Sequence, residues 1–131
     1  MARTRPRLLL SMQRFLRYTA VGAFATLVHY ALLVFAVERL GWPAPWGSGF
    51  GAVVGAQIAY AGNRRLTFAH DGPVAASWWR FQLTALAGAG VGMAIVAAAV
   101  ALGWHYLVGQ VLATGTSLLL TFAINRFWTF R

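Results

Sequence analysis

Two polar phrases of nearly the same composition each follow a long apolar stretch of the chain. The first is AGNRRLTF at residues 61–68, and the second is AINRFWTF at residues 123–130. An arginine guanidinium can bind a phosphate bidentately, and asparagine and threonine side chains can add hydrogen bonds. The two phrases therefore suggest a lipid-phosphate site. Its candidate residues are Asn63, Arg64, Arg65, Thr67, Asn125, Arg126 and Thr129.

A structural interpretation of the phrases is equally open. Asparagine can end a helix, arginine near a helix C-terminus complements the helix dipole, and aromatic residues anchor a chain at the membrane interface. The C-terminal end of a helix repels anions, so only the side chains could attract a phosphate there. Because the phrase occurs twice, the phosphate interpretation and the structural interpretation are about equally supported.

Polar residues also recur inside the apolar stretches. The candidates for a polar track are His29, Gln57, Gln110, Thr114, Ser117 and Thr121. The last four follow helical spacing on one face that leads to Asn125. In lipid such a face turns towards protein or a wet cavity. The stripe therefore predicts either helix–helix hydrogen bonds or the lining of a path for a polar headgroup. His29 has the same two interpretations, as an interhelical hydrogen bonder or as a contact for protons or substrate.

Several kinds of chemistry are not supported. The chain has no cysteine, no metal-ligand cluster and no carboxylate inside an apolar stretch, and Glu38 and Asp71 are its only acidic residues. These two fall on opposite sides of the membrane in the topology below, so they cannot form an acid–base pair. We expect a protein that is not an enzyme and uses no cofactor.

Composition places the chain in a membrane. Of its 131 residues 60% are hydrophobic and 10% charged, and its mean hydropathy is +0.64, whereas soluble domains carry about 25% charged residues. The net charge of +9 comes from arginine alone. Because these arginines flank apolar spans, we expect them to meet membrane lipids and lipid phosphate, and not nucleic acid.

The chain is long enough for one all-α membrane domain over residues 1–131. Four stretches reach the length of about 20 residues that a spanning helix needs, at 18–37, 46–62, 82–102 and 106–124. Residues 1–17 form a basic leader, in which 7–17 place Leu8, Met12, Phe15 and Leu16 opposite the arginines. This pattern predicts a short interfacial amphipathic helix, and the alternative is a disordered leader.

Arginine also predicts the orientation. Five arginines precede the first span, three lie in the middle connection and two follow the last span, against Arg39 alone on the other side. The positive-inside rule then places both termini in the cytoplasm.

The two halves of the chain resemble each other. Arg14-Phe15 recurs 66 residues later as Arg80-Phe81, and the Asn-Arg phrases are 62 residues apart. Each half is then one helical hairpin, which predicts a parallel repeat. Small residues spaced by four predict close packing within the chain or in a homo-oligomer. They are Gly47, Gly51, Gly55 and Ala59, Gly88 and Gly92, and Gly109 and Ala113.

These motifs resemble those of the GtrA-like family of four-span membrane proteins over about residues 12 to 131. The matching motifs are Arg14-Phe15-Leu16-x-Tyr18, Asn63-Arg64-x-x-Thr67-Phe68, Arg80-Phe81 and Asn125-Arg126-Phe127-Trp128-Thr129-Phe130. The resemblance implies a bacterial or archaeal cytoplasmic membrane and a role in cell-surface polysaccharide synthesis. It also implies a flippase for a polyprenyl-phosphate-linked monosaccharide. Arg65 departs from the pattern, because Phe127 stands at the matching position of the second phrase.

Two other functions are alternatives to the flippase. A non-transporting adaptor would recruit a glycosyltransferase and would tolerate changes in the polar stripe. A small multidrug exporter would need a membrane-embedded glutamate, which this sequence lacks.

Overall fold

The computed structural model describes residues 5–67 and 74–124, all of them in helices or short connections. Helix α1 spans Arg5–Glu38, α2 spans Ala44–Gly62, α3 spans Val74–Ala101 and α4 spans Tyr106–Ile124. A five-residue π-helix, η1, continues α2 over Asn63–Thr67. The predicted all-α class is confirmed.

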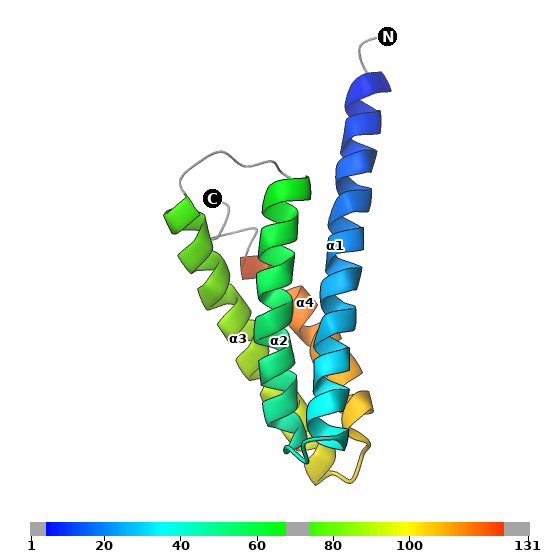
Figure 1. The fold of residues 1–131 in the computed structure, drawn as a ribbon, viewed down its shortest axis with the longest axis vertical. Helices are drawn as coiled ribbons and strands as arrows, with labels where there is room; N and C mark the ends of the chain where they lie inside the picture. The colour runs from blue at the N-terminus through cyan, green and yellow to red at the C-terminus, as the bar shows by residue number, and fades with distance from the viewer. Residues whose placement is uncertain (1–4, 68–73, 125–131) are drawn as a thin grey trace.

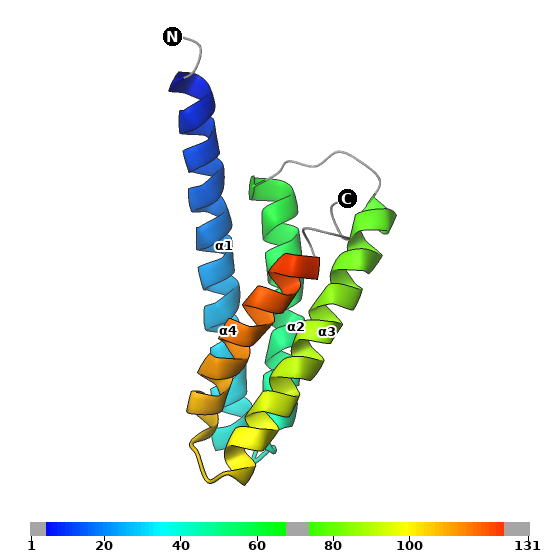
Figure 2. The same ribbon diagram turned by 180° about the vertical axis from the view of Figure 1, so that it is seen from behind.

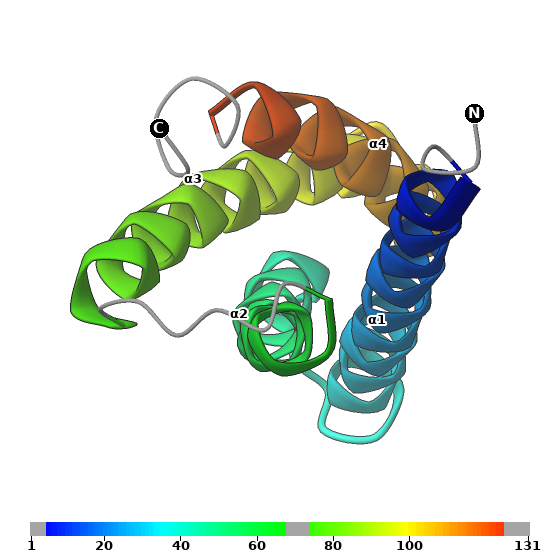
Figure 3. The same ribbon diagram turned by 90° about the horizontal axis from the view of Figure 1, so that it is seen from above.

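The helices converge at one end of the molecule and diverge towards the other. Figures 1 and 2 show them meeting where α1 passes into α2 and α3 into α4, and spreading towards the N-terminal end of α1. Seen along the bundle, α1, α4 and α3 form an arc with α2 on its inner side (Figure 3). Helix α2 packs on both α1 and α3, and α3 packs on α4.

Glycine forms the tight turns at the converging end. Gly41 and Gly103 adopt φ values of +68° and +82°, which residues with a Cβ rarely adopt. Pro43 precedes α2, where its fixed φ suits a helix start. The helix ends predicted here lie within two residues of those in the structure.

Three of the described helices are long and apolar enough to cross a membrane. They are Arg7–Glu38, Trp78–Ala101 and Tyr106–Ile124. The chain is therefore a multi-pass membrane protein. Helix α2 is not among the three, although its length of 19 residues is sufficient. Its five glycines and Gln57 lower its hydropathy.

The predicted boundary between a leader helix and the first span is wrong. Helix α1 runs unbroken for 34 residues, and Leu8, Met12, Phe15 and Leu16 are exposed on its N-terminal part. A hydropathy pattern detects where apolar residues begin, but arginine, leucine and glutamine all favour the helix. Nothing in residues 5–17 therefore stops it.

The predicted small-residue contacts lie within the chain. A Cβ added at Gly51 would lie 2.6 Å from the His29 carbonyl oxygen, and one added at Gly55 would lie 3.1 Å from that of Ala25. In the second hairpin, a Cβ at Gly109 would lie 2.7 Å from the Ala99 methyl. Glycine thus brings each pair of helices into backbone contact.

Candidate functional site

The first Asn-Arg phrase lies at the diverging end of the bundle, where α2 becomes η1. Asn63 has a right-handed backbone, with φ −67°, and its N–H contacts the carbonyl oxygens of Ala59 and Tyr60. It therefore does not form the left-handed cap typical of a helix end, and the helix widens into η1 instead. Arg64 is half-buried and Arg65 exposed. Short π-helical segments are frequent at functional sites.

The second phrase cannot be placed beside the first. Asn125, Arg126 and Thr129 lie outside the described residues, which end at residue 124. Only the half of the candidate phosphate site on α2 and η1 is therefore described.

The polar stripe of α4 begins in a buried hydrogen-bonded cluster near the converging end. Gln110 is only 2% exposed, and its Oε1 accepts a bond of 2.5 Å from the Ser48 hydroxyl of α2. Its Nε2 donates to Thr114 Oγ1 at 3.2 Å. The Tyr30 hydroxyl of α1 forms a 2.7 Å hydrogen bond with Thr114 Oγ1. This cluster joins α1, α2 and α4 across the bundle.

The other half of the stripe faces α3. The Ser117 hydroxyl donates to the Gly88 carbonyl oxygen at 3.0 Å, and Thr121 donates to the Ser117 carbonyl at 2.7 Å. Because Gly88 has no side chain, Ser117 can reach the backbone of the neighbouring helix. Gln110, Thr114 and Ser117 therefore form interhelical hydrogen bonds, one of the two predicted uses of the stripe, while Thr121 bonds within α4.

Gln57 pairs with a residue that the sequence did not single out. Its Nε2 donates to Gln82 Oε1 at 2.6 Å, and Gln82 Nε2 donates back to Gln57 Oε1 at 3.0 Å. The pair joins α2 to α3 towards the diverging end. No pattern along one chain marks Gln82, because its importance comes from a neighbour 25 positions away.

His29 lies between α1 and α2. Its ring is half-buried, meets the edge of Tyr30 with centroids 5.6 Å apart, and faces Gly51. Among the described residues, its Nε2 is a buried atom with no hydrogen-bond partner.

The polar track candidates thus lie at separate helix interfaces. Gln110 and Thr114 share one cluster, Ser117 and Thr121 another, while Gln57 and His29 lie apart from both. Interhelical hydrogen bonds in membranes contribute on average about 0.6 kcal/mol each. Such bonds are weak enough for a ligand to replace them.

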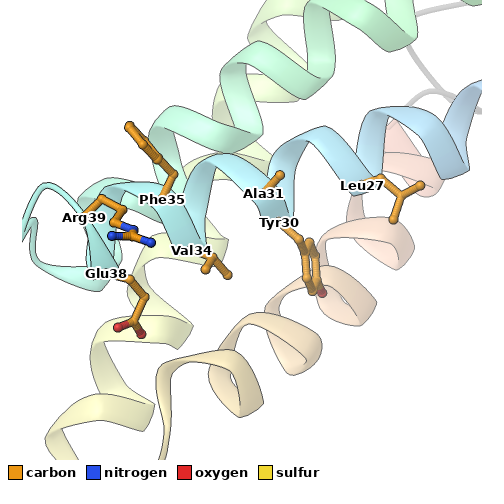
Figure 4. A pocket seen from close by; sticks show the side chains of 7 residues that line it. All are labelled: Leu27, Tyr30, Ala31, Val34, Phe35, Glu38 and Arg39. Carbon is orange, nitrogen blue, oxygen red and sulfur yellow. The ribbon is translucent and has the colours of Figure 1, made fainter.

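The outer surface of α1 carries an apolar groove of about 570 Å³ (Figure 4). Its lining residues are Leu27, Tyr30, Ala31, Val34, Phe35, Glu38 and Arg39. At its end Glu38 accepts a 2.9 Å hydrogen bond from Tyr106 of α4. The lining suits a hydrocarbon chain and offers few partners to a sugar.

Comparison with known proteins gives one result. The family model described as "GtrA/DPMS, transmembrane domain" matches residues 17–131, which is most of the chain. No curated protein and no solved structure matches.

Proposed function

We infer the function from one premise: the chain belongs to the GtrA/DPMS transmembrane-domain family. Membership suggests a role in cell-surface polysaccharide synthesis. Within that role, we propose that the protein flips a polyprenyl-phosphate-linked monosaccharide across the cytoplasmic membrane. The observation that carries this proposal is the half-buried Arg64 in a π-helical turn at the diverging end of a membrane bundle.

The proposed topology has four crossings and both termini in the cytoplasm. Two observations support it. Helix α1 packs on α2 and α3 on α4, and most arginines of the described residues lie towards the diverging end. In this topology α2 is the fourth crossing, and its glycines lie against α1 and α3. The two hairpins then form a parallel repeat.

Cysteine labelling tests the orientation directly, because the natural chain contains no cysteine. Leu40→Cys lies at the converging end and Ser11→Cys near the start of α1, and both positions are exposed. In intact cells a membrane-impermeant maleimide should label Leu40→Cys, and should label Ser11→Cys only after permeabilisation. The reverse pattern would contradict a cytoplasmic N-terminus.

The proposed phosphate clamp consists of the two Asn-Arg phrases. Arg64 and Arg126 bind the lipid phosphate at the cytoplasmic boundary, with Asn63, Asn125 and the threonines of the phrases as further donors. The polar side chains of α4 then exchange their interhelical hydrogen bonds for bonds to the sugar as it crosses. Since four helices enclose little space, we propose that a homo-oligomer completes the path.

Flipping can be measured with the full chain in vesicles and a fluorescent polyprenyl-phosphate sugar. Losing one charge-assisted hydrogen bond costs about 1.5–3 kcal/mol. Arg64→Ala and Arg126→Ala should therefore slow transfer by roughly 10-fold or more. Arg7→Ala removes an exposed arginine near the start of α1 and outside the Asn-Arg phrases, so it is the control and should transfer at the wild-type rate.

Wild-type vesicles that transfer no faster than protein-free ones would refute the flippase. Co-purification with a glycosyltransferase, in variants that keep their activity after changes in the polar stripe, would then support the adaptor alternative.

A further inference from the structure

We propose that Gln57, Gln82 and Tyr60 form the subsite that binds the sugar of the lipid-linked substrate on the cytoplasmic side. This inference rests on the proposed function and adds the residues that distinguish a glycosylated lipid phosphate from a bare one. The three residues lie on the seam between α2 and α3.

The Gln57–Gln82 pair can bind a ligand while its reciprocal hydrogen bonds remain intact. Each glutamine offers two N–H groups and two carbonyl lone pairs. The reciprocal bonds of 2.6 and 3.0 Å use one donor and one acceptor of each. Gln57 Nε2 also donates to the Val53 carbonyl oxygen of its own helix at 3.4 Å. Among the described residues Gln82 has no other side-chain hydrogen bond, and Gln57 is exposed. Adjacent donors and acceptors match sugar hydroxyls, which donate and accept at once.

The depth of the pair suits a sugar whose phosphate is bound by Arg64. Gln57 and Arg64 are seven residues apart, which places them on one face of the helix and about 10 Å apart along its axis. Gln82 begins the second turn of the candidate span Trp78–Ala101. One hexose linked to a phosphate fits this separation, with the phosphate at the boundary and the sugar just inside it.

The repeat-related positions carry leucine in place of these amides. In the predicted repeat, the counterpart of Gln57 is Leu119, 62 residues on, and that of Gln82 is Leu16, 66 residues before it. Both leucines are exposed, at 76% and 62%. The repeat therefore does not itself require a glutamine at either position. Gln57 is exposed and Gln82 half-buried, and polar side chains inside a membrane are costly and generally have a function.

Tyr60 and Phe81 extend the subsite along the same seam. Their rings lie 5.2 Å apart at 53°. Their counterparts in the repeat are Phe122 of α4 and Phe15 of α1, neither of which has a hydroxyl. An aromatic face next to amides gives a sugar an apolar surface as well as hydrogen bonds.

The test is binding of two lipids to the purified full chain. One probe is polyprenyl phosphate, and the other is a set of its glucosyl, galactosyl and mannosyl derivatives. Wild-type protein should bind at least one derivative more tightly than the bare lipid. Gln57→Leu/Gln82→Leu should weaken that binding by 10-fold or more and change the affinity for polyprenyl phosphate less than twofold. Arg64→Ala should weaken both.

Two controls keep the result interpretable. The double leucine variant has the residues of the repeat-related positions, Leu119 and Leu16, so it should fold, and circular dichroism checks this. Thr116→Val removes an exposed hydroxyl that bonds only within α4, to the Leu112 carbonyl, and should bind both lipids as wild type does.

The outcomes separate this inference from the proposed function. Equal binding of every derivative and the bare lipid by wild-type protein, or unchanged binding by the double variant, would overturn the sugar subsite even if flipping occurs. Glutamine-dependent binding without transfer in vesicles would support the subsite and refute the flippase.

Discussion

Gly51→Ala will lower the free energy of unfolding by about 2–3 kcal/mol, in the upper part of the range for overpacked cores. The added Cβ would lie 2.6 Å from both the carbonyl oxygen and the Cδ2 of His29, where ordinary contacts begin at 3.4 Å. The carbonyl belongs to the backbone of α1 and cannot move alone. The two helices must therefore separate, and the contacts of Gly47 and Gly55 with α1 open with them.

Unfolding in SDS, followed by circular dichroism, measures this loss against two matched glycine variants. A Cβ at Gly90 meets nothing within 4 Å, so Gly90→Ala should be no less stable than wild type. A Cβ at Gly49 meets the flexible thioether of Met93, so Gly49→Ala should lose less than Gly51→Ala. Equal stability of the Gly51 and Gly90 variants would refute the close contact of α1 with α2.

Gln110→Ala will cost about 3 kcal/mol, because it combines a cavity with the loss of interhelical hydrogen bonds. Gln110 is almost fully buried and links Ser48 of α2 to Thr114 of α4. Truncation empties the space that its side chain fills and leaves the Ser48 hydroxyl without its partner in the cluster.

Gln110→Leu separates the two causes. Leucine keeps most of the volume and removes the polar group, so its cost should be about 1 kcal/mol, close to that of hydrogen bonds in membranes. Thr116→Val on the exposed face of α4 should change stability by less than about 0.5 kcal/mol. A leucine variant as unstable as the alanine variant would show that the hydrogen bonds, and not the filled volume, hold this cluster together.

The sequence predicted helix ends well where a local stop signal exists. Gly41 and Gly103 adopt the left-handed backbone of the turns, and Pro43 precedes the start of α2. The helix ends beside these residues are within two residues of the prediction. The starts of two helices differ by more, since α1 begins at Arg5 and α3 at Val74 instead of at 18 and 82. Polar residues with a high helix propensity can extend a helix beyond its apolar stretch, and a hydropathy pattern does not detect that extension.

The sequence predicts those features of the candidate site that depend on the spacing of residues within one helix. Spacing alone placed Gln110, Thr114, Ser117 and Thr121 on one face of α4, and the structure has them facing neighbouring helices. Their partners depend on how helices meet, which no single-helix pattern contains. Ser48, Tyr30 and Gln82 were missed for this reason, since each acts through a residue of another helix.

The apolar stretches of α2 and α4, each followed in the sequence by an asparagine and an arginine, have a consequence for the surrounding lipid. Their 19 residues give each an apolar length of about 28 Å along its axis, slightly less than a hydrocarbon core of about 30 Å. Figure 2 shows α4 inclined within the bundle, which shortens its projection further. A helix shorter than the core thins the bilayer beside it. In the proposed flipping, this hydrophobic mismatch would reduce the distance that a sugar headgroup travels through hydrocarbon, and the thinned bilayer would form part of the path.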